Sequence, residues 1–254
     1  NMIIDGRAIA RELEQGLKKS LLEVPQKSVA FVMFLDTPAT RQFIAMKSKV
    51  AERLGVSAET IECLDCRTTE EAVVRIGEIA RKPYDGIVVQ LPLPADFIAE
   101  DVLNAVPAGL DIDGLRRDSK FLAPVAMAVW KILDYCNIDL GGKEVVVVGN
   151  GRLVGGPVVR MLVDENLPVK LVEKETDDKT MRTLIKNADV IISGVGVPGL
   201  ITPDMIKEGV VLIDAGTSEQ SGKLVGDVDP ACAGKASFMT PVPGGVGPVT
   251  VACL

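Results

Sequence analysis

The chain has 254 residues, a formal net charge of −7 and no histidine. The acidic balance, with both signs interspersed, argues against nucleic acid as a partner, and no apolar run is long enough to cross a bilayer, so we expect no membrane contact. The lack of histidine excludes Ser-His-Asp chemistry and the usual zinc sites. We therefore expect no metal, and a general base must be a lysine, a carboxylate, a tyrosine or a thiol.

The cysteines indicate the compartment. There are five of them, and an odd number in a long chain favours a reducing, cytoplasmic location over a disulfide framework. Cys63 and Cys66 form the pair CLDC. Because no histidine or second pair completes a metal site, we expect these thiols to pack at the end of a strand.

The first half of the chain alternates strand-like and helix-like segments. Short apolar runs of strand length occur at 29–35, 60–64 and 86–91, and stretches with helical periodicity occupy 39–54 and 70–81. This alternation predicts a βαβαβ arrangement with a parallel sheet.

The second half repeats the alternation. A helix-like segment at 125–135 leads into strand-like runs at 144–148, 168–172, 190–195 and 210–214. We therefore predict two α/β domains, 1–118 and 119–254, divided in the polar stretch 111–120. The last segment, 240–254, is dense in proline and glycine, and we expect it to run irregularly over a functional surface.

One lysine on the predicted helix 39–54 is out of place. Thr37 and Pro38 supply an N-cap and a first-turn proline, and Gly55 closes the helix. On that register one core-facing stripe collects Phe43, Lys47, Val50 and Leu54, with Met46 beside them. The ammonium of Lys47 either reaches water from a partly buried stem, which is the commoner outcome, or lies in a cleft where it exchanges protons near neutrality.

Three further polar residues have both a functional and a structural interpretation. Gln90 stands at the carboxyl end of the strand 86–91, where open α/β sheets place ligand contacts, although a loop-capping amide would explain it too. Asp111 and Asp113 lie in LDIDG before Gly114, a pattern that by itself favours a turn.

The segment GNGRLVGGP at 149–157 follows the apolar run VVVV. A strand, then G-x-G, then a helix is typical of a turn whose backbone amides and helix N-terminus hold a pyrophosphate, and Gly149 and Gly151 stand in the right places. The third glycine of the usual fingerprint would fall at Val154, but the glycines occur at Gly155 and Gly156. We interpret the segment as a dinucleotide turn; a tight corner that binds nothing is the alternative.

The next predicted strand ends in two charged residues that bear on the cofactor. Glu173 stands where a carboxylate accepts hydrogen bonds from the adenosine ribose and repels a 2′-phosphate, which favours NAD. Lys174 is beside it and would instead attract a 2′-phosphate, as in NADP. The choice between NAD and NADP depends on which side chain faces the ribose.

Taken together, these segments resemble the bifunctional methylenetetrahydrofolate dehydrogenase/cyclohydrolase family. The resemblance is carried by FIAMKSK at 43–49, DGIVVQLPLP at 85–94, LDIDG at 110–114, VVGNGRLVGGP at 147–157, ADVIISGVGVPGLI at 188–201, VVLIDAG at 210–216, GDVD at 226–229 and TPVPGGVGPVTVACL at 240–254. It implies a folate cleft between two α/β domains, the second of them Rossmann-like, with 240–254 returning to that cleft. It also implies a tetrahydrofolate derivative as substrate, NAD or NADP as cofactor, and a homodimer.

The resemblance assigns roles to single residues. Lys47 would be the catalytic lysine, Gln90 would orient it, and one of Asp111 and Asp113, with Asp113 preferred, would hold the pterin ring. The expected substrate contacts are Phe43, Asp111, Pro241, Pro243, Gly244, Gly245 and Val246. The expected cofactor contacts are Gly149, Asn150, Gly151, Arg152, Val154, Gly155, Glu173, Gly194, Val195, Gly196 and Thr217.

The chain departs from the family pattern at three places. Phe43 replaces a tyrosine four residues before the lysine, which removes a hydroxyl able to bond Lys47 and bears on cyclohydrolase activity. APVA at 123–126 replaces a proline-cysteine-threonine-proline stretch, so polar contacts near the cofactor are lost. Asn150 and Gly151 replace Arg-Ser, which removes an arginine contact to a 2′-phosphate and again favours NAD. The family pattern also continues into a closing helix beyond 254.

These observations leave three hypotheses. The leading one is an enzyme that oxidises methylenetetrahydrofolate with a nicotinamide cofactor and then hydrolyses the methenyl product to formyltetrahydrofolate. The second, based on Phe43 and the APVA stretch, is a catalytically weakened relative that binds folate or nucleotide as a sensor or assembly subunit. The third, an unrelated Rossmann dehydrogenase, explains the glycine turn but not QLPLP or PVPGGVGP.

Overall fold

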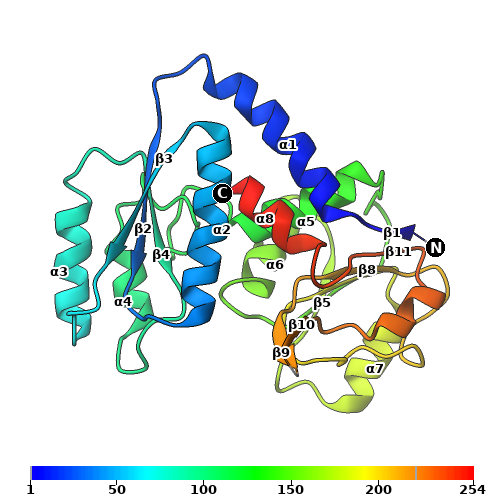
Figure 1. Cartoon of the computed structure of the whole chain (residues 1–254). Helices are drawn as coiled ribbons and strands as arrows, with labels where there is room; N and C mark the ends of the chain where they lie inside the picture. The colour runs from blue at the N-terminus through cyan, green and yellow to red at the C-terminus, as the bar shows by residue number, and fades with distance from the viewer. Residues whose placement is uncertain (1, 221) are drawn as a thin grey trace. The chain divides into compact units, whose positions relative to one another are not determined.

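The computed structural model describes residues 2–220 and 222–254 as an α/β fold in which every strand pairing but one is parallel (Figure 1). The predicted fold class is confirmed. Within the described part of the chain, none of the helices combines the length and apolar character needed to span a membrane.

The chain divides into two compact units. The N-terminal unit contains Glu12–Ala123 together with Leu254, and the C-terminal unit contains Pro124–Cys253 together with residues 2–11. The sequence placed the N-terminal residues in the first domain. They belong to the second unit because the short strand β1 (Met2–Ile3) pairs in parallel with β11 (Phe238–Met239) at the edge of its sheet. The helix that follows β1 is α1 (Gly6–Leu21).

The N-terminal unit is built on a three-stranded parallel sheet. Its order is β3 (Ser57–Glu62), β2 (Ser28–Met33) and β4 (Gly86–Gln90). Figure 1 shows α2 (Pro38–Leu54) on one face of this sheet and α3 (Thr69–Ile79) on the other, where α4 (Ala99–Asn104) also packs. The strands β2 and β4 are buried on both faces, which is why they read as continuous apolar runs in the sequence.

Helix α2 begins and ends at the predicted signals. The Thr37 side chain accepts a hydrogen bond from the Thr40 amide, and the Thr40 hydroxyl accepts one from the Thr37 amide, which forms a capping box. At the other end Gly55 adopts a left-handed φ of 76°. These two ends fix the register of every side chain between them.

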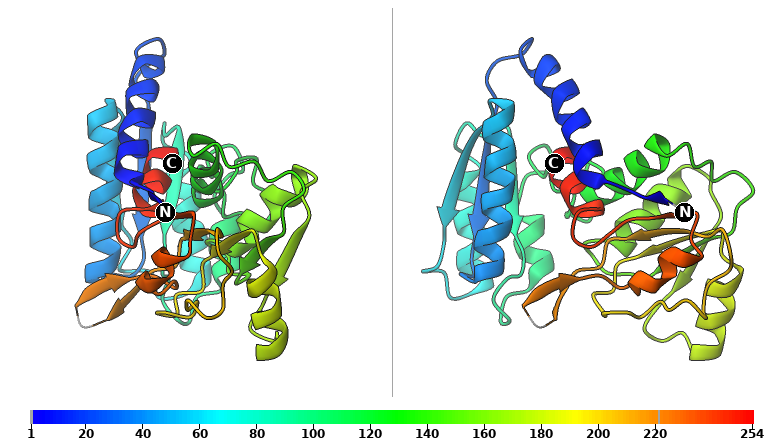
Figure 2. Two further views of the ribbon diagram at one scale, coloured as in Figure 1. Left: turned by 90° about the vertical axis from the view of Figure 1, so that its right-hand side faces the viewer. Right: turned by 45° about the vertical axis from the view of Figure 1, so that its right-hand side comes forward.

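The C-terminal unit is built on a six-stranded parallel sheet of order β1-β11-β8-β7-β5-β6. Four of these strands are β5 (Val145–Val148), β6 (Val169–Val172), β7 (Val190–Ser193) and β8 (Val211–Asp214). Figures 1 and 2 show α5 (Pro124–Tyr135), α6 (Gly155–Asp164) and α8 (Val246–Cys253) on one face, and α7 (Asp178–Asn187) and the 3₁₀ helix η1 (Pro230–Gly234) on the other.

Two elements of this unit differ from the expectations. The chain after β8 forms an antiparallel hairpin, β9 (Ser218–Gln220) with β10 (Lys223–Val225). The last segment is irregular only up to Gly245, since α8 begins at Val246. Pro248 lies in the first turn of α8, where the missing amide hydrogen costs no hydrogen bond.

The topology of the larger sheet locates a ligand crevice. After β5 the chain adds β6 on one side, and it then crosses over to add β7 on the other side. Open α/β sheets bind ligands at such a switch point, beyond the carboxyl ends of the strands. The glycine turn at Gly149 follows β5 at this point.

Candidate active site

The core-facing side of α2 differs from the predicted stripe. Phe43 and Met46 are 40% and 39% exposed, so the expectation that they face the core is wrong. The buried positions are Thr40, Ile44 and Ala51. Lys47 lies one turn from Ile44 and from Ala51 on this same side, and it is half-buried. The lysine is therefore the charged residue on the side of α2 that faces the sheet.

Gln90, the last residue of β4, meets this lysine. Its side chain is oriented by strand alternation, because Val88, two residues earlier, packs with Ile44 of α2. The Lys47 Nζ donates a hydrogen bond to Gln90 Oε1 at 3.2 Å, and Gln90 Nε2 donates one to the Leu91 carbonyl at 2.7 Å. Gln90 is only 7% exposed. Both ends of its amide are engaged, so it holds the ammonium from a fixed position.

The two aspartates of the LDIDG segment have different surroundings. Asp111 is buried, and its carboxylate accepts hydrogen bonds from the backbone amides of Leu115 and Arg116 at 3.3 and 3.0 Å. It therefore fixes the loop. Asp113 is half-buried and accepts no hydrogen bond from the described residues.

The charge of Lys47 affects the pKa of the Asp113 carboxyl group. Burial raises the pKa of Asp113, the nearby Lys47 ammonium opposes this increase, and Asp111 adds to it. The structure thus brings Lys47, Gln90 and Asp113 together within the N-terminal unit. Of the two aspartates, Asp113 is the one whose carboxylate remains available to a ligand.

The loop Pro241–Val246 belongs to the C-terminal unit and is held by its backbone. Gly245 packs so closely on α1 that a Cβ on Gly6 would lie 1.8 Å from the Gly245 carbonyl oxygen. Gly244 has a φ of 108°, which a residue with a side chain rarely adopts. The loop is anchored by Thr240, whose amide donates to the Leu212 carbonyl at 3.0 Å. Its residues are prolines, valines and glycines, so no long or charged side chain projects from it.

The glycine turn has the geometry that close approach to a pyrophosphate requires. Gly149 has a φ of 95°, and a Cβ on Gly155, the first residue of α6, would lie 1.8 Å from the Gly149 carbonyl oxygen. Gly155 thus fills the helix-packing role of the third glycine of the fingerprint, one position later than usual. The intervening Val154 packs against Gly194, where a Cβ would lie 2.2 Å from Val154 Cγ1.

These features fit a dinucleotide. The chain enters α6 from a strand end through exposed residues at Asn150, Gly151 and Arg152, so their amides and the helix N-terminus are accessible to an anion. On the other side of the switch point, a Cβ on Gly149 would lie 3.0 Å from Val195 Cγ2. Gly196 and Thr217 continue this surface, since a Cβ on Gly196 would lie 3.6 Å from the Thr217 carbonyl oxygen.

Glu173, the first residue after β6, is hydrogen-bonded to the glycine turn. Asn150 Nδ2 donates to Glu173 Oε1 at 2.8 Å. The Glu173 amide donates to Thr176 Oγ1 at 2.9 Å, which fixes the backbone of the turn. Among the described residues neither Lys174 nor Arg152 forms an ion pair. The carboxylate, and not the adjacent lysine, is the side chain tied to the turn.

Two buried carboxylates escaped the sequence-based expectations. Asp214 and Asp227 are 2% and 0% exposed. They lie in the segments VVLIDAG and GDVD, which contribute to the family resemblance but to which no role was assigned from the sequence. For Asp214, the available signal was an acidic residue directly after a run of strand-forming residues.

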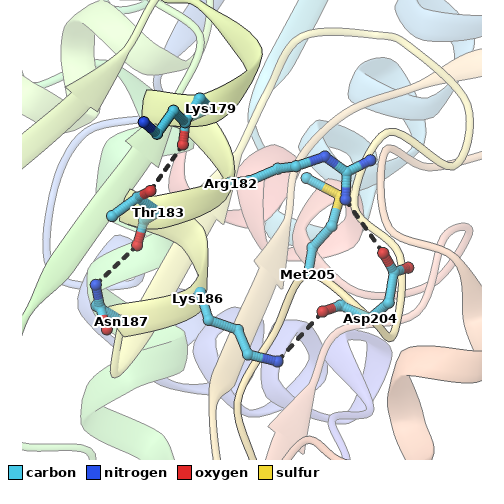
Figure 3. Close-up of a pocket in the computed structure, with 7 residues that line it drawn as sticks. All are labelled: Lys179, Arg182, Thr183, Lys186, Asn187, Asp204 and Met205. Atoms are coloured by element: carbon cyan, nitrogen blue, oxygen red, sulfur yellow. Dashed lines mark hydrogen bonds and ion pairs between the residues drawn. The ribbon is translucent and has the colours of Figure 1, made fainter.

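A groove of about 520 Å³ lies elsewhere, along α7 (Figure 3). Two of its basic side chains already have partners: Arg182 pairs with Asp204 at 3.1 Å, and Lys186 Nζ donates to the carbonyls of Asp204 and Ile206. Thr183 and Asn187 donate to carbonyls of their own helix. We assign no ligand to this groove because most of its polar side chains bond within the chain.

Comparison with protein families gives two matches that together cover most of the chain. Residues 4–113 match the family described as tetrahydrofolate dehydrogenase/cyclohydrolase, catalytic domain, and residues 123–254 match the one described as tetrahydrofolate dehydrogenase/cyclohydrolase, NAD(P)-binding domain. Among curated proteins, the bifunctional protein FolD of a Sulfurovum species is 36% identical over 99% of this chain and 95% of its own length. FolD of Staphylococcus aureus is 34% identical over 98% and 92%.

Similar solved structures belong to the same family. The bifunctional FolD methylenetetrahydrofolate dehydrogenase/cyclohydrolase of Campylobacter jejuni has a TM-score of 0.93 and 31% identity, and covers 99% of this chain and 95% of its own. The Trypanosoma brucei enzyme, solved with NADP and an inhibitor, has a TM-score of 0.91 and 29% identity, with 99% and 94% covered. These matches give no support to the hypothesis of a weakened binding protein.

Proposed function

The chain belongs to the tetrahydrofolate dehydrogenase/cyclohydrolase family, and from this premise we propose that Lys47, Gln90 and Asp113 are the residues with which it acts on its substrate. Its function is that of the family: it oxidises methylenetetrahydrofolate to methenyltetrahydrofolate with a nicotinamide cofactor, and it hydrolyses the product to formyltetrahydrofolate. The hydride transfer requires a dinucleotide beside the folate, whereas the hydrolysis requires only a positioned charge and water.

The contact between Lys47 and Gln90 carries the proposal. Hydrolysis adds water to the methenyl carbon and releases a proton, and a positioned amine can stabilise charge on the folate nitrogen and assist that proton transfer. Lys47 is half-buried and fixed by the Gln90 amide at 3.2 Å. A lysine free in solvent would not keep one position relative to a bound carbon.

Asp113 is proposed to hold the pterin ring. The ring presents N–H groups on one edge, and a carboxylate accepts such donors. Two observations support Asp113 over Asp111: the Asp111 carboxylate is already bonded to two backbone amides, and the charge of Asp113 is coupled to that of Lys47.

The remaining substrate contacts are proposed at Phe43 and in the loop Pro241–Val246. Phe43 is exposed one turn before Lys47, so its ring is available to pack on a flat ligand. The backbone of the loop offers carbonyl and amide groups, and its glycines keep side chains out of the way.

The dinucleotide is proposed to bind at Gly149–Gly155. When bound, it accepts the hydride that leaves the methylene carbon. The chain contributes the amides of Asn150 and Gly151 and the N-terminus of α6 for the pyrophosphate. Gly194, Val195, Gly196 and Thr217 are proposed to line the adjoining surface beyond β7.

We propose NAD as the preferred cofactor. The Glu173 carboxylate is oriented by Asn150 and keeps its second oxygen for a ribose hydroxyl. A 2′-phosphate would meet this negative charge without the bidentate arginine contact that the family pattern provides. Lys174, the residue that would favour NADP, is not bonded to the turn.

A steady-state assay tests the function and the cofactor together. Oxidation of methylenetetrahydrofolate is followed with each dinucleotide, and hydrolysis of methenyltetrahydrofolate is followed without one. We expect both activities, with a higher kcat/KM for NAD than for NADP. An equal or higher kcat/KM with NADP would contradict the role of Glu173.

A homodimer is the proposed assembly, and it rests on the family resemblance. Light scattering of the purified protein at several concentrations tests it, with twice the chain mass expected.

A further inference from the structure

Two buried carboxylates in the C-terminal unit take no part in the chemistry proposed above. Asp227 and Asp214 are almost inaccessible to solvent, and buried charges of this kind need dedicated partners. No ion pair with lysine or arginine compensates them among the described residues. Their partners are backbone amides and hydroxyl groups instead.

Asp227 binds the turn that follows β7. Its Oδ2 accepts hydrogen bonds from the Val195 amide at 2.7 Å and from Ser193 Oγ at 2.7 Å, and its Oδ1 accepts one from the Val197 amide at 2.8 Å. Alternate amides of one short turn thus point at a single carboxylate. Such charge-assisted bonds are shorter and stronger than neutral ones.

Asp214 holds Asp227 in place from the end of β8. Its carboxylate accepts hydrogen bonds from the amides of Gly216, Asp227 and Val228 at 3.0, 3.2 and 2.9 Å. The segment that carries Asp227 is therefore fixed at its own backbone. It cannot follow the turn after β7 if that turn moves.

Two glycines show how tightly the pair is enclosed. A Cβ on Gly216 would lie 2.2 Å from Asp227 Cγ, and a Cβ on Gly226 would lie 2.0 Å from Asp214 Oδ2. Side chains at these positions would displace both carboxylates. Glycine therefore occupies both positions at which a carboxylate packs directly against the backbone.

The turn that Asp227 binds lies against the glycine turn at the switch point. The Val195 side chain and the Gly194 carbonyl oxygen would lie 3.0 and 3.3 Å from a Cβ on Gly149. We infer that Asp227 is a positioning residue for the dinucleotide: it keeps the Gly194–Val197 turn in one conformation, so that the wall opposite Gly149 is preformed before the cofactor binds. This inference rests on the proposed placement of the dinucleotide at Gly149.

The same cluster extends to the proposed substrate loop. The Asp214 amide donates to Thr240 Oγ1 at 2.7 Å, and Thr240 immediately precedes Pro241. Val242 of that loop packs over Gly226, where a Cβ would lie 2.7 Å from Val242 Cγ2. The substrate loop is thus held by the Asp214 backbone amide and by Gly226, whereas the cofactor turn is held by the Asp227 carboxylate.

A carboxylate is required for this role. An asparagine is nearly the same size, but its NH₂ group would face at least one of the two backbone N–H groups, and two donors cannot bond each other. Asp227→Asn therefore removes one amide contact without adding bulk. Ser193→Ala is the matched control, because it removes a hydrogen bond to the same carboxylate and leaves both amides bonded.

Hydrogen exchange, cofactor titration and the cofactor-free reaction together test the inference. In the unmodified protein we expect slow exchange of the Val195 and Val197 amides although their side chains are exposed, and in Asp227→Asn faster exchange there. NADH and NADPH binding, followed by fluorescence, should weaken about tenfold or more in Asp227→Asn and stay within about twofold in Ser193→Ala. Methenyltetrahydrofolate hydrolysis without dinucleotide should change little in either variant.

Three outcomes would overturn the inference. One is rapid exchange of the Val195 and Val197 amides in the unmodified protein, a result that needs no folded variant. Another is unchanged dinucleotide binding in Asp227→Asn. The last is an equal loss of hydrolysis and of dinucleotide binding, which indicates general destabilisation. Gly149→Ala distinguishes failure of this inference from failure of the proposed cofactor site. If Gly149→Ala also leaves dinucleotide binding unchanged, the proposed site is wrong.

Discussion

The Lys47 ammonium and the Gln90 side-chain amide, 43 residues apart in the chain, meet at 3.2 Å. One comes from the buried side of α2 and the other from the end of β4, so two rigid elements set the position of the charge. The Gln90 Nε2 group is fixed on the Leu91 carbonyl. A small change on either element therefore displaces the ammonium from its position, and this makes the pair a sensitive target for substitution.

Replacing the lysine is the first prediction. Lys47→Met keeps the length of the side chain and removes the charge, so hydrolysis of methenyltetrahydrofolate should fall by about 10²-fold or more. The control is Lys49→Met, since Lys49 is exposed on the same helix and should keep full activity. Both are measured by the absorbance of the methenyl substrate. Persistence of normal hydrolysis in Lys47→Met would mean that this lysine is only a surface residue.

The second prediction concerns the phenylalanine one turn before the lysine. Phe43→Tyr restores the hydroxyl of the family pattern and places it at i−4 from Lys47, where side chains on a helix meet. We expect hydrolysis to increase several-fold, with little change in methylenetetrahydrofolate oxidation. Phe43→Leu, which removes the ring, should weaken folate binding instead. If Phe43→Tyr leaves hydrolysis unchanged, that hydroxyl has no role here.

Much of the fold could be predicted because its signals are local. The capping residues Thr37 and Gly55 and the apolar runs of the parallel strands depend on a few neighbouring residues. The buried side of α2 could not be predicted in the same way. Phe43 and Met46 are apolar yet exposed, and hydrophobicity alone does not say which side of a helix the sheet will cover.

The candidate site, like the fold, could be predicted from the sequence only in part. Gln90 was found from its place at a strand end, which topology makes informative. Asp227 gave no signal of its role, because its partners are backbone amides of a turn about thirty residues away. Backbone donors leave no trace in side-chain patterns, so this contact could be found only once the strands were placed side by side.

The third prediction separates the two charged residues after β6. Glu173→Gln keeps the oxygen that Asn150 bonds and removes the charge, so the ratio of kcat/KM for NAD to that for NADP should fall about tenfold. Lys174→Gln is the matched control and should leave this ratio within about twofold. The reverse pattern, with the larger effect at Lys174, would assign the ribose contact to the lysine.

The fourth prediction is a pH dependence at Asp214. Burial raises its pKa to about 6, and the Asp227 carboxylate adds to this increase against the amides of Val228, Asp227 and Gly216. A carboxyl whose pKa is raised by folding stabilises the protein while it is protonated in both states, and this contribution is lost between about pH 4 and pH 6 as the unfolded chain ionises first. The full loss is about 3 kcal/mol.

Urea unfolding of the unmodified protein and of Asp214→Asn from pH 4 to pH 7 measures this contribution. The asparagine variant should be less stable at every pH, because both oxygens of a carboxyl group, protonated or not, can accept a hydrogen bond and the NH₂ group of an amide cannot. Its deficit should be largest near pH 4 and should shrink as the pH rises. A deficit that grows with pH would mean that Asp214 stabilises the fold as a carboxylate.

The fifth prediction uses two adjacent glycines in the first turn of α6. A Cβ on Gly155 would lie 1.8 Å from the Gly149 carbonyl oxygen, whereas a Cβ on Gly156 would lie 3.4 Å from the Gly151 carbonyl oxygen. Gly155→Ala must therefore push the helix from the strand, and we expect a loss of about 3 kcal/mol in the free energy of unfolding together with weaker dinucleotide binding. Gly156→Ala should change stability by about 1 kcal/mol at most, since alanine favours helix. Equal effects of the two substitutions on unfolding and on cofactor titration would show that helix propensity, and not the close approach of α6 to the glycine turn, determines the need for glycine there.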